Sequence, residues 1–84
     1  MTKVELYYAP WCPFCRRAKS LLDEKKVNYT LIDVDAEPSE RDVMQQRGAG
    51  HTIPQIFIND KPIGGCDDLY ALEASGNLDK LLHT

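Results

Sequence analysis

The 84-residue chain lacks several features that mark large classes of protein. No apolar run approaches the roughly 20 residues that a membrane-spanning helix needs, so we expect no membrane insertion. Acidic residues (13) outnumber basic ones (10), whereas a nucleic-acid binder normally shows a basic patch or stripe. The first three residues lead straight into a strand-like segment, so we expect no secretory leader. Neither nucleic acid nor a membrane is an expected partner.

Cysteine is scarce, and its number, three, is odd. One Cys-x-x-Cys pair plus the single Cys66 suits a reducing compartment better than a disulfide framework, so we expect the cytoplasm. A structural disulfide between Cys12 and Cys15 is disfavoured because so short a loop constrains the unfolded chain little. A zinc site would need two more ligands, which Cys66 with His51 or His83 supplies in number only. We therefore expect no metal.

The segment Cys12-Pro13-Phe14-Cys15 lies between an apolar run and an amphipathic run, at a predicted strand-to-helix junction. One helical turn brings the two sulfurs close enough to close into a disulfide and reopen. A helix N-terminus favours negative charge, and a cysteine there can have a pKa well below the free value of about 8.5. Pro13 suits the first helical position. The pattern predicts a redox pair in which Cys12 is an accessible nucleophile and Cys15 is shielded.

The first 34 residues have the pattern of a βαβ unit. Residues 4–8 alternate as a strand does, and apolar side chains recur at helical spacing over 13–25. Residues 27–34 are β-branched and aromatic, which predicts a second strand. A strand reached through a helix lies parallel to the first.

The rest of the chain predicts a helix, a hairpin and a helical end. A helix over 37–46 should turn Val43 and Met44 inward. The remaining elements are an antiparallel hairpin of residues 55–58 and 61–63 around Asn59-Asp60, a helix from Asp67 or Asp68 to Gly76, and a last turn over 78–82. Together these predict one α/β domain over residues 1–84, in the order βαβαββα, with a four-stranded mixed sheet and helices on both faces.

Three motifs, in this order, resemble the glutaredoxin family, and the likeness to its short bacterial dithiol members runs along nearly the whole chain. They are Cys12-Pro13-Phe14-Cys15, Thr52-Ile53-Pro54 and Gly64-Gly65-Cys66-Asp67-Asp68. The resemblance implies the thioredoxin fold, with a redox pair in the first motif. It also implies that the second motif presents a cis proline and a strand-like backbone to glutathione, and that the third holds its γ-glutamyl end.

Residue by residue, the resemblance implies that Cys12 and Cys15 are catalytic. The implied glutathione-binding residues are Cys12, Phe14, Thr52, Ile53, Pro54, Cys66 and Asp67. Elementary chemistry supports them, because backbone beside a cis proline can pair with an extended peptide and a helix N-terminus can bind a carboxylate. Two simpler interpretations stay open: Ile53-Pro54 as ordinary packing, and Gly64-Gly65 with Asp67 as an ordinary turn and helix cap.

The sequence departs from the family pattern near the first cysteine. Ala9 stands where the family often has a lysine, and Phe14 replaces a tyrosine. The glycine carboxylate of glutathione would need another cation, for which Arg47 and Arg16 are candidates, and a lysine restored at position 9 should strengthen binding. Ala9-Pro10-Trp11-Cys12 instead resembles the thioredoxin approach to its motif. Trp11 is therefore either a contact surface for protein disulfides or a half-buried aromatic rim.

The sequence predicts a monomeric oxidoreductase that uses glutathione as reducing co-substrate. Its predicted substrates are protein disulfides and glutathione mixed disulfides, with ribonucleotide reductase among the partners that the resemblance implies. One alternative is a thioredoxin-like hydrogen donor recycled by a flavoprotein reductase, which the segment Ala9-Pro10-Trp11 supports. Another is a carrier in which Cys12 and glutathione hold an iron–sulfur cluster between two subunits, against which Pro13 speaks by resemblance.

Overall fold

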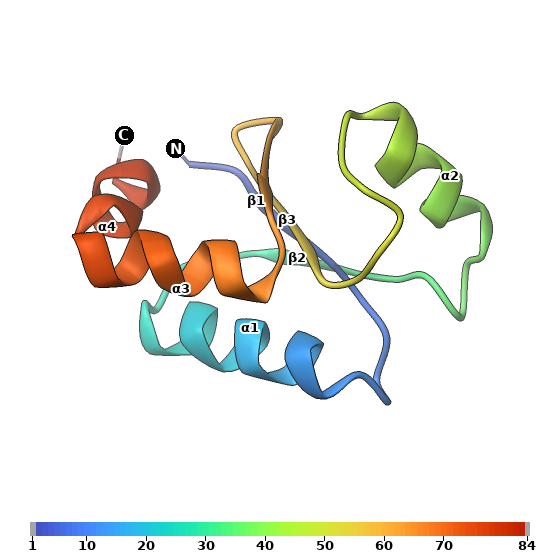
Figure 1. The fold of residues 1–84 in the computed structure, drawn as a ribbon, viewed down its shortest axis with the longest axis horizontal. Helices are drawn as coiled ribbons and strands as arrows, with labels where there is room; N and C mark the ends of the chain where they lie inside the picture. Colours follow the sequence, from blue (N-terminus) through green and yellow to red (C-terminus); the bar gives the residue numbers. More distant parts are fainter. Residues whose placement is uncertain (1, 84) are drawn as a thin grey trace.

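The computed structural model describes residues 2–83 and has a central sheet with helices on both sides (Figure 1). Its elements are β1 (Val4–Tyr8), α1 (Pro13–Glu24), β2 (Thr30–Asp33), α2 (Ser39–Gln46), β3 (Gln55–Ile58), β4 (Lys61–Gly64), α3 (Cys66–Ser75) and α4 (Asn77–Leu82). The strand order is β2-β1-β3-β4, with β1 parallel to β2 and β3 antiparallel to both β1 and β4. The predicted mixed α/β sheet is confirmed, and the expected last turn is the helix α4.

Alternate residues of the central strands face opposite layers, as the strand period of two requires. Leu6 of β1 and Ile56 of β3 pack against α1, α3 and α4 in the larger core cluster. Their neighbours Tyr7 and Phe57 face the other side, where they pack edge to face with ring centroids 5.5 Å apart and contact Met44 of α2. The sheet is therefore covered by α1, α3 and α4 on one face and by α2 alone on the other (Figure 1).

Two sequence expectations about these layers are wrong. Strand β2 begins at Thr30 and not at residue 27, because Lys26 has a positive φ of 57° that redirects the chain after α1. Val27 and Tyr29 pack against the larger core from this connection, so their apolar character serves packing and not strand pairing. Val43 is 38% exposed, since α2 covers a small cluster and turns only a narrow stripe, centred on Met44, inward.

The turn and cap predictions hold. Asn59 and Asp60 both have positive φ, 52° and 67°, as a tight hairpin turn demands. Gly76 ends α3 in the left-handed conformation, with φ 80°. The predicted start of α3 at Asp67 or Asp68 is wrong by one or two residues, since the helix begins at Cys66 after the N-cap Gly65. No helix within residues 2–83 is long and apolar enough to cross a membrane.

Polar contacts join α1 to the helices beside it. Nζ of Lys25, at the end of α1, lies 2.5 Å from Glu73 Oε1 in α3 and 3.0 Å from Asp79 Oδ1 in α4. Halfway along, the Tyr70 hydroxyl of α3 donates to the carbonyl of Arg17 in α1 at 3.1 Å. Because these contacts add to a shared apolar core, α1 and α3 form one packed unit.

Candidate active site

Cys12 is the residue at which the chain turns from β1 into α1. Its backbone N–H donates to the Ala9 carbonyl at 3.1 Å, and Pro13 follows at the first helical position. Sγ of Cys12 accepts the backbone N–H of Cys15 at 3.2 Å, so the sulfur itself caps the helix. A donor aimed at sulfur at the positive end of a helix stabilises negative charge there. The predicted N-cap position of Cys12 is confirmed.

The expected accessibility of Cys12 is wrong, since only 4% of its surface is exposed. Capping turns the side chain inward, where it packs with Ala9, Cys15 and the partly buried Ile53. Sγ of Cys12 donates to the Ile53 carbonyl at a sulfur–oxygen distance of 4.0 Å. The candidate nucleophile is therefore nearly buried, and its sulfur lies beside the backbone of the second motif.

Cys15 lies in the first turn of α1 and has no exposed surface, as predicted. Burial, together with a hydrogen bond to Cys12, raises the pKa of Cys15 from 9.0 to about 12. At neutral pH this thiol keeps its proton while it lies against the Cys12 sulfur. A buried thiol that keeps its proton beside the N-cap sulfur suits the later, resolving role.

The second motif reaches the cysteine pair through the loop before β3. The Ile53-Pro54 peptide bond is cis, as predicted, and Pro54 is buried. The amide of Gln55 donates to the Thr52 hydroxyl at 3.4 Å, which links the loop to the first residue of β3. The Ile53 carbonyl faces Cys12, so the loop brings its backbone beside the sulfur.

The third motif needs both of its glycines to bring α3 to this place. Gly64 has φ 118°, and a Cβ there would lie 2.2 Å from Oδ2 of Asp68. A Cβ on Gly65 would lie 3.3 Å from the Pro54 carbonyl. Oδ2 of Asp68 accepts the Gly65 N–H at 3.0 Å and fixes the start of the helix. Two residues without side chains therefore let the end of α3 approach the second motif.

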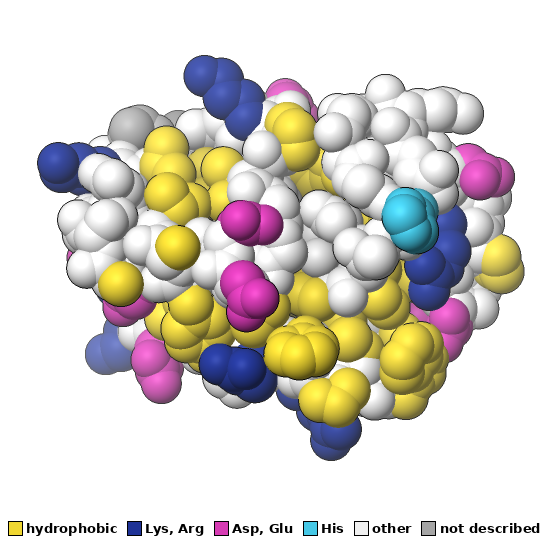
Figure 2. Space-filling model, in the orientation of Figure 1, with side chains coloured by type: hydrophobic (Ala, Val, Ile, Leu, Met, Phe, Trp, Pro, Cys, Tyr) yellow, Lys and Arg dark blue, Asp and Glu magenta, His cyan; other side chains and the backbone are white. Residues whose placement is uncertain are grey.

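These segments line an open groove of about 390 Å³ beside the cysteine pair. Its lining includes six of the seven residues that the resemblance implies for glutathione: Phe14, Thr52, Ile53, Pro54, Cys66 and Asp67. Cys12 lies beneath one end, against Ile53. Figure 2 shows acidic side chains over the start of α3 and apolar ones over the start of α1, on either side of this region.

Cys66 is the third thiol of the region and occupies the first position of α3. Its exposed fraction, 4%, equals that of Cys12. Burial raises the pKa of Cys66, and the nearby Asp67 carboxylate acts in the same direction, although Arg17 opposes both. Cys66 thus lies in the groove as a protonated thiol.

Arg47 does not face the groove, and its predicted role at the glycine carboxylate is wrong. Its Nη1 and Nη2 atoms donate to the two carboxylate oxygens of Glu5 at 2.9 and 2.7 Å. The same guanidinium donates to the Tyr7 hydroxyl at 2.8 Å and lies 4.0 Å from the Phe57 ring centroid. Its hydrogen bonds to Glu5 raise the pKa of Arg47. It is held on the α2 face of the sheet, where α2 ends.

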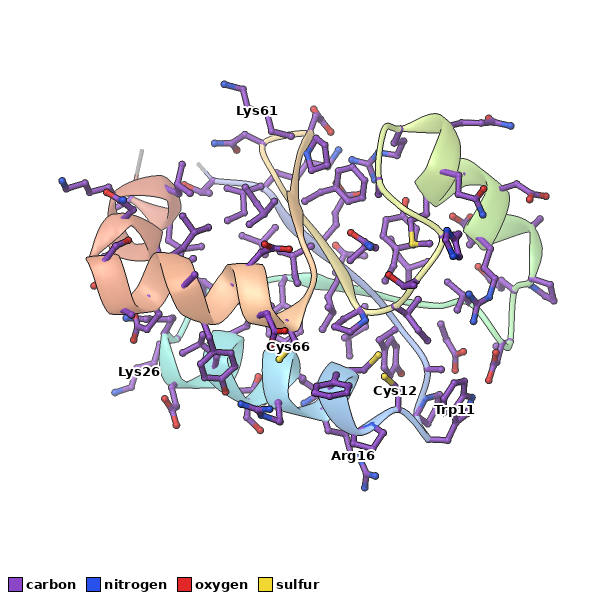
Figure 3. The ribbon with its side chains drawn as sticks, in the orientation of Figure 1. Trp11, Cys12, Arg16, Lys26, Lys61 and Cys66 are labelled. Atoms are coloured by element: carbon purple, nitrogen blue, oxygen red, sulfur yellow. The ribbon has the colours of Figure 1, made fainter. Side chains whose placement is uncertain are left out.

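Arg16 and Arg41 do not line the groove either, although Arg41 contacts the loop that precedes Thr52. Arg16 projects from the outer face of α1, away from Cys12, so it too is not at the groove (Figure 3). Arg41 of α2 donates to the carbonyl of His51, immediately before Thr52, at 3.3 Å. Sequence reasoning missed Arg41, because its position depends on how α2 lies against the loop. A basic residue one helix before the second motif was the available signal.

Position 9, where the family often has a lysine, is buried in this structure. Ala9 has no exposed surface and packs against Cys12 and Cys15. A longer side chain there would have to leave this packing to reach the groove, and the effect of Ala9→Lys on glutathione binding stays a prediction.

Phe14 forms one wall of the groove and is 54% exposed. The guanidinium carbon of Arg17 lies 6.0 Å from its ring centroid and 5.2 Å from that of Tyr70. Arg17 therefore joins the wall on α1 to α3. Its role was also missed from the sequence, in which it is one of several basic residues of α1.

The zinc alternative finds no ligand cluster. Within residues 2–83 no group of three or more His, Cys, Asp or Glu side chains is arranged so that it could hold a metal ion. His51, which was counted as a ligand candidate, is exposed in the loop beside Arg41.

A thiol pair at a strand-to-helix junction, beside a cis proline and on a four-stranded mixed sheet, defines the class of thioredoxin-fold thiol–disulfide oxidoreductases. Within that class, a glutaredoxin family model matches residues 4–63. The chain belongs to the glutaredoxin family, and it is a thiol–disulfide oxidoreductase.

Individual relatives agree with this assignment. The chain is 49% identical to glutaredoxin 3 of Escherichia coli strain K12 over 82 residues, which are 98% of this chain and 99% of that protein. The solution structure of a Brucella melitensis glutaredoxin is 51% identical, with a TM-score of 0.83 over 98% of this chain and 89% of that one. A crystal structure of a buckwheat glutaredoxin–glutathione complex is 28% identical, with a TM-score of 0.88 over 96% and 76%.

Proposed function

We propose that the protein uses glutathione to reduce glutathione mixed disulfides and protein disulfides through Cys12 and Cys15. The observation that carries this proposal is the groove, which gathers six residues of three separate motifs beside the Cys12 sulfur. The buckwheat glutaredoxin, which is similar in fold, was solved as a complex with glutathione.

In the proposed pose, glutathione lies along the groove in an extended form. Its central backbone pairs with the strand-like segment before Pro54, as a peptide pairs with a sheet edge. Its γ-glutamyl carboxylate meets backbone N–H groups in the first turn of α3, which have no acceptor within the helix. The exposed Asp67 carboxylate accepts from the α-ammonium group. We assign the glycine carboxylate to Arg41, the cation that contacts the loop next to Thr52.

For a glutathione mixed disulfide, the Cys12 thiolate attacks the glutathione sulfur. The disulfide of the substrate breaks, the other thiol leaves and takes a proton from water, and Cys12 becomes glutathionylated. A second glutathione, as thiolate, attacks that mixed disulfide. It releases oxidised glutathione and returns the Cys12 thiolate.

For a protein disulfide, Cys12 attacks one sulfur and forms a mixed disulfide with the substrate. Cys15 then attacks Cys12, releases the second substrate thiol and leaves the Cys12–Cys15 disulfide, which two glutathiones reduce. The raised pKa of Cys15 makes it a poor nucleophile until it loses its proton. It therefore waits for the mixed disulfide and does not compete with Cys12.

A coupled assay with two reductants tests the proposal. The mixed disulfide of glutathione and cysteamine is supplied with glutathione and glutathione reductase, and in a parallel arm with a thioredoxin reductase alone. We expect turnover only in the first arm. Turnover in the second arm without glutathione would favour the thioredoxin-like donor and contradict the proposal.

A further inference from the structure

We propose that Trp11, held in place by Asp35, is the contact surface for the protein half of a glutathione mixed disulfide. The inference rests on the proposed function and adds the substrate class, glutathionylated proteins with an apolar residue beside the modified cysteine. It begins with exposure: Trp11 is 62% exposed, more than the other large apolar side chains that lie at the surface of residues 2–83.

A single exposed apolar residue is ordinary on a protein surface. Trp11 differs because a hydrogen bond holds its ring in place. The indole N–H donates to the carboxylate of Asp35, in the loop that follows β2. Oδ1 of Asp33 accepts the backbone N–H groups of Asp35 and Ala36 at 2.9 and 3.0 Å, which holds that loop in turn. The exposed ring thus has a fixed orientation and loses little conformational freedom when a partner packs on it.

The position of Trp11 relative to the Cys12 sulfur determines which part of a substrate it can contact. It directly precedes Cys12 and takes no part in lining the groove. In Figure 3 the labelled Cys12 lies between Cys66, on the groove side, and Trp11. When glutathione fills the groove, the other half of its disulfide has to leave Cys12 on the side away from α3, and Trp11 is the side chain presented there.

The chemistry of the step fits this division. Cys12 attacks the glutathione sulfur, so the bond that breaks releases the protein thiol on the Trp11 side. A tryptophan at such a place offers a large, rigid apolar face, and interface tryptophans commonly carry much of the binding energy. The matching partner is an extended segment with an apolar side chain next to its glutathionylated cysteine. A small mixed disulfide, which lacks that segment, makes no use of the ring.

The test compares two substrates at saturating glutathione. One is the glutathione–cysteamine mixed disulfide, and the other is a ten-residue peptide with leucines on both sides of a glutathionylated cysteine. For Trp11→Ala we expect the ratio of kcat/KM on the peptide to kcat/KM on the small disulfide to fall about tenfold, as for an interface hot spot. Trp11→Phe should keep most of the ratio. As a control, Val43→Ala, which removes an exposed apolar side chain elsewhere, on α2, should leave the ratio unchanged.

Asp35 is a positioning residue, and a structural readout checks its part. Trp11 is the only tryptophan of the chain, so its fluorescence anisotropy reports the motion of that ring. Asp35→Ala should add fast indole motion and lower the substrate ratio, whereas Asp35→Asn, whose amide oxygen still accepts the N–H, should restore both.

The outcomes separate the two proposals. If the wild type reduces both substrates and Trp11→Ala changes the ratio by less than about twofold, a deficit below the size of a hot spot, the Trp11 surface is refuted and the proposed function stands. If the wild type reduces neither substrate with glutathione, the proposed function fails and this inference fails with it.

Discussion

Helices α1 and α3 both begin at the groove, and each begins with a buried cysteine, yet the two ends are built in opposite ways. At α1 the sulfur of Cys12 is the cap, and the first turn holds no acidic residue. At α3 the cap is Gly65, Cys66 is already inside the helix, and Asp67 and Asp68 occupy the first turn. The positive end of α1 therefore serves the protein's own sulfur, whereas that of α3 already has carboxylates beside it.

Because Cys12 and Cys66 are equally exposed, burial does not decide which thiol reacts. Their positions relative to the helix start decide it, because Cys12 is the N-cap of α1 and Cys66 is the first residue of α3. A side chain at the N-cap points back over the first-turn N–H groups, whereas one at the first position points out from the helix. The α3 end, with N–H donors and Asp67 together, suits a ligand that carries both a carboxylate and an ammonium group.

The sharpest way to break this comparison is to remove each thiol. Cys12→Ser should reduce turnover of a glutathione mixed disulfide to the uncatalysed rate, because the attacking thiolate is gone. Cys66→Ala should change it by less than about threefold, because α3 offers its backbone and not that sulfur. Iodoacetamide labelling of the reduced wild type, read by peptide mapping, should modify Cys12 first. Prior labelling of Cys66 would contradict the assignment of the nucleophile.

A second test deforms the α3 end alone. Gly64→Ala should lower the free energy of unfolding by about 2 to 4 kcal/mol, because it places a side chain at φ 118° and displaces Asp68 from the Gly65 N–H. Gly76→Ala, at φ 80° with no atom within 4 Å of the new Cβ, should cost only about 1 to 2 kcal/mol. Urea unfolding measures both. Equal losses would show that the approach to Asp68 is not tight.

The ligand chemistry assigned to α3 is tested by Asp67→Asn. The amide removes the negative charge and keeps the size, so glutathione should bind about tenfold more weakly, as for loss of a charge-assisted hydrogen bond at an exposed site. Kinetics at varied glutathione concentration give the change in KM. Asp68→Asn is the less suitable control, since Asp68 caps the helix, and Glu24→Gln, at the far end of α1, is the better one. An unchanged KM for Asp67→Asn would contradict the proposal that Asp67 accepts from the α-ammonium group of glutathione.

A smaller effect is expected from Arg41, the cation that contacts the loop before Thr52. Arg41→Gln should weaken glutathione binding by less than about tenfold, since exposed ion pairs contribute roughly 0 to 1 kcal/mol, and the difference should shrink in high salt. Arg47→Lys, which keeps the charge near Glu5, should leave the glutathione KM unchanged. If only the Arg47 variant affected the KM, the glycine carboxylate would have been assigned to the wrong arginine of this face.

The smallest effect at neutral pH concerns the second thiol of α1. The folded pKa of Cys15, about 12, lies above its ordinary value of 9.0, so the fold favours the protonated thiol. The stabilisation is complete below pH 9 and is lost as the pH rises toward 12. Wild-type stability in urea should therefore fall more steeply from pH 9 to 11 than that of Cys15→Ala. If the free energy of unfolding fell equally with pH in both proteins, the raised pKa of Cys15 would be contradicted.

Most of the fold could be predicted because its signals are local. The helical spacing in α1, the Asn59-Asp60 turn and the Gly76 cap each follow from a few neighbouring residues. The errors occur where a tertiary contact decides. Val27 and Tyr29 have strand-like composition but pack as a connection, and Val43 lies on a helix that has little core to cover.

The site divides in the same manner. The cysteine pair was recognisable because its chemistry depends on a fixed spacing along the chain, whereas the cis proline and the role of the glycine pair were implied by the resemblance to the glutaredoxin family. The charged groups were not recognisable, because a long cationic side chain takes its role from whatever carboxylate or carbonyl lies within reach. Arg47 is bound to Glu5, 42 positions away, and Arg41 reaches His51 only because α2 crosses that loop.

The contacts of Lys25 and Tyr70 have a consequence for which substrates can react. They tie α1 to α3 along their length, so the gap between the Cys12 sulfur and the first turn of α3 is a set length. If glutathione binds as proposed, a thiol compound held by its γ-glutamyl group at α3 reaches Cys12 only when its sulfur lies at the matching distance. We expect γ-glutamylcysteine to span this length and cysteinylglycine, which has nothing to anchor at α3, to fail.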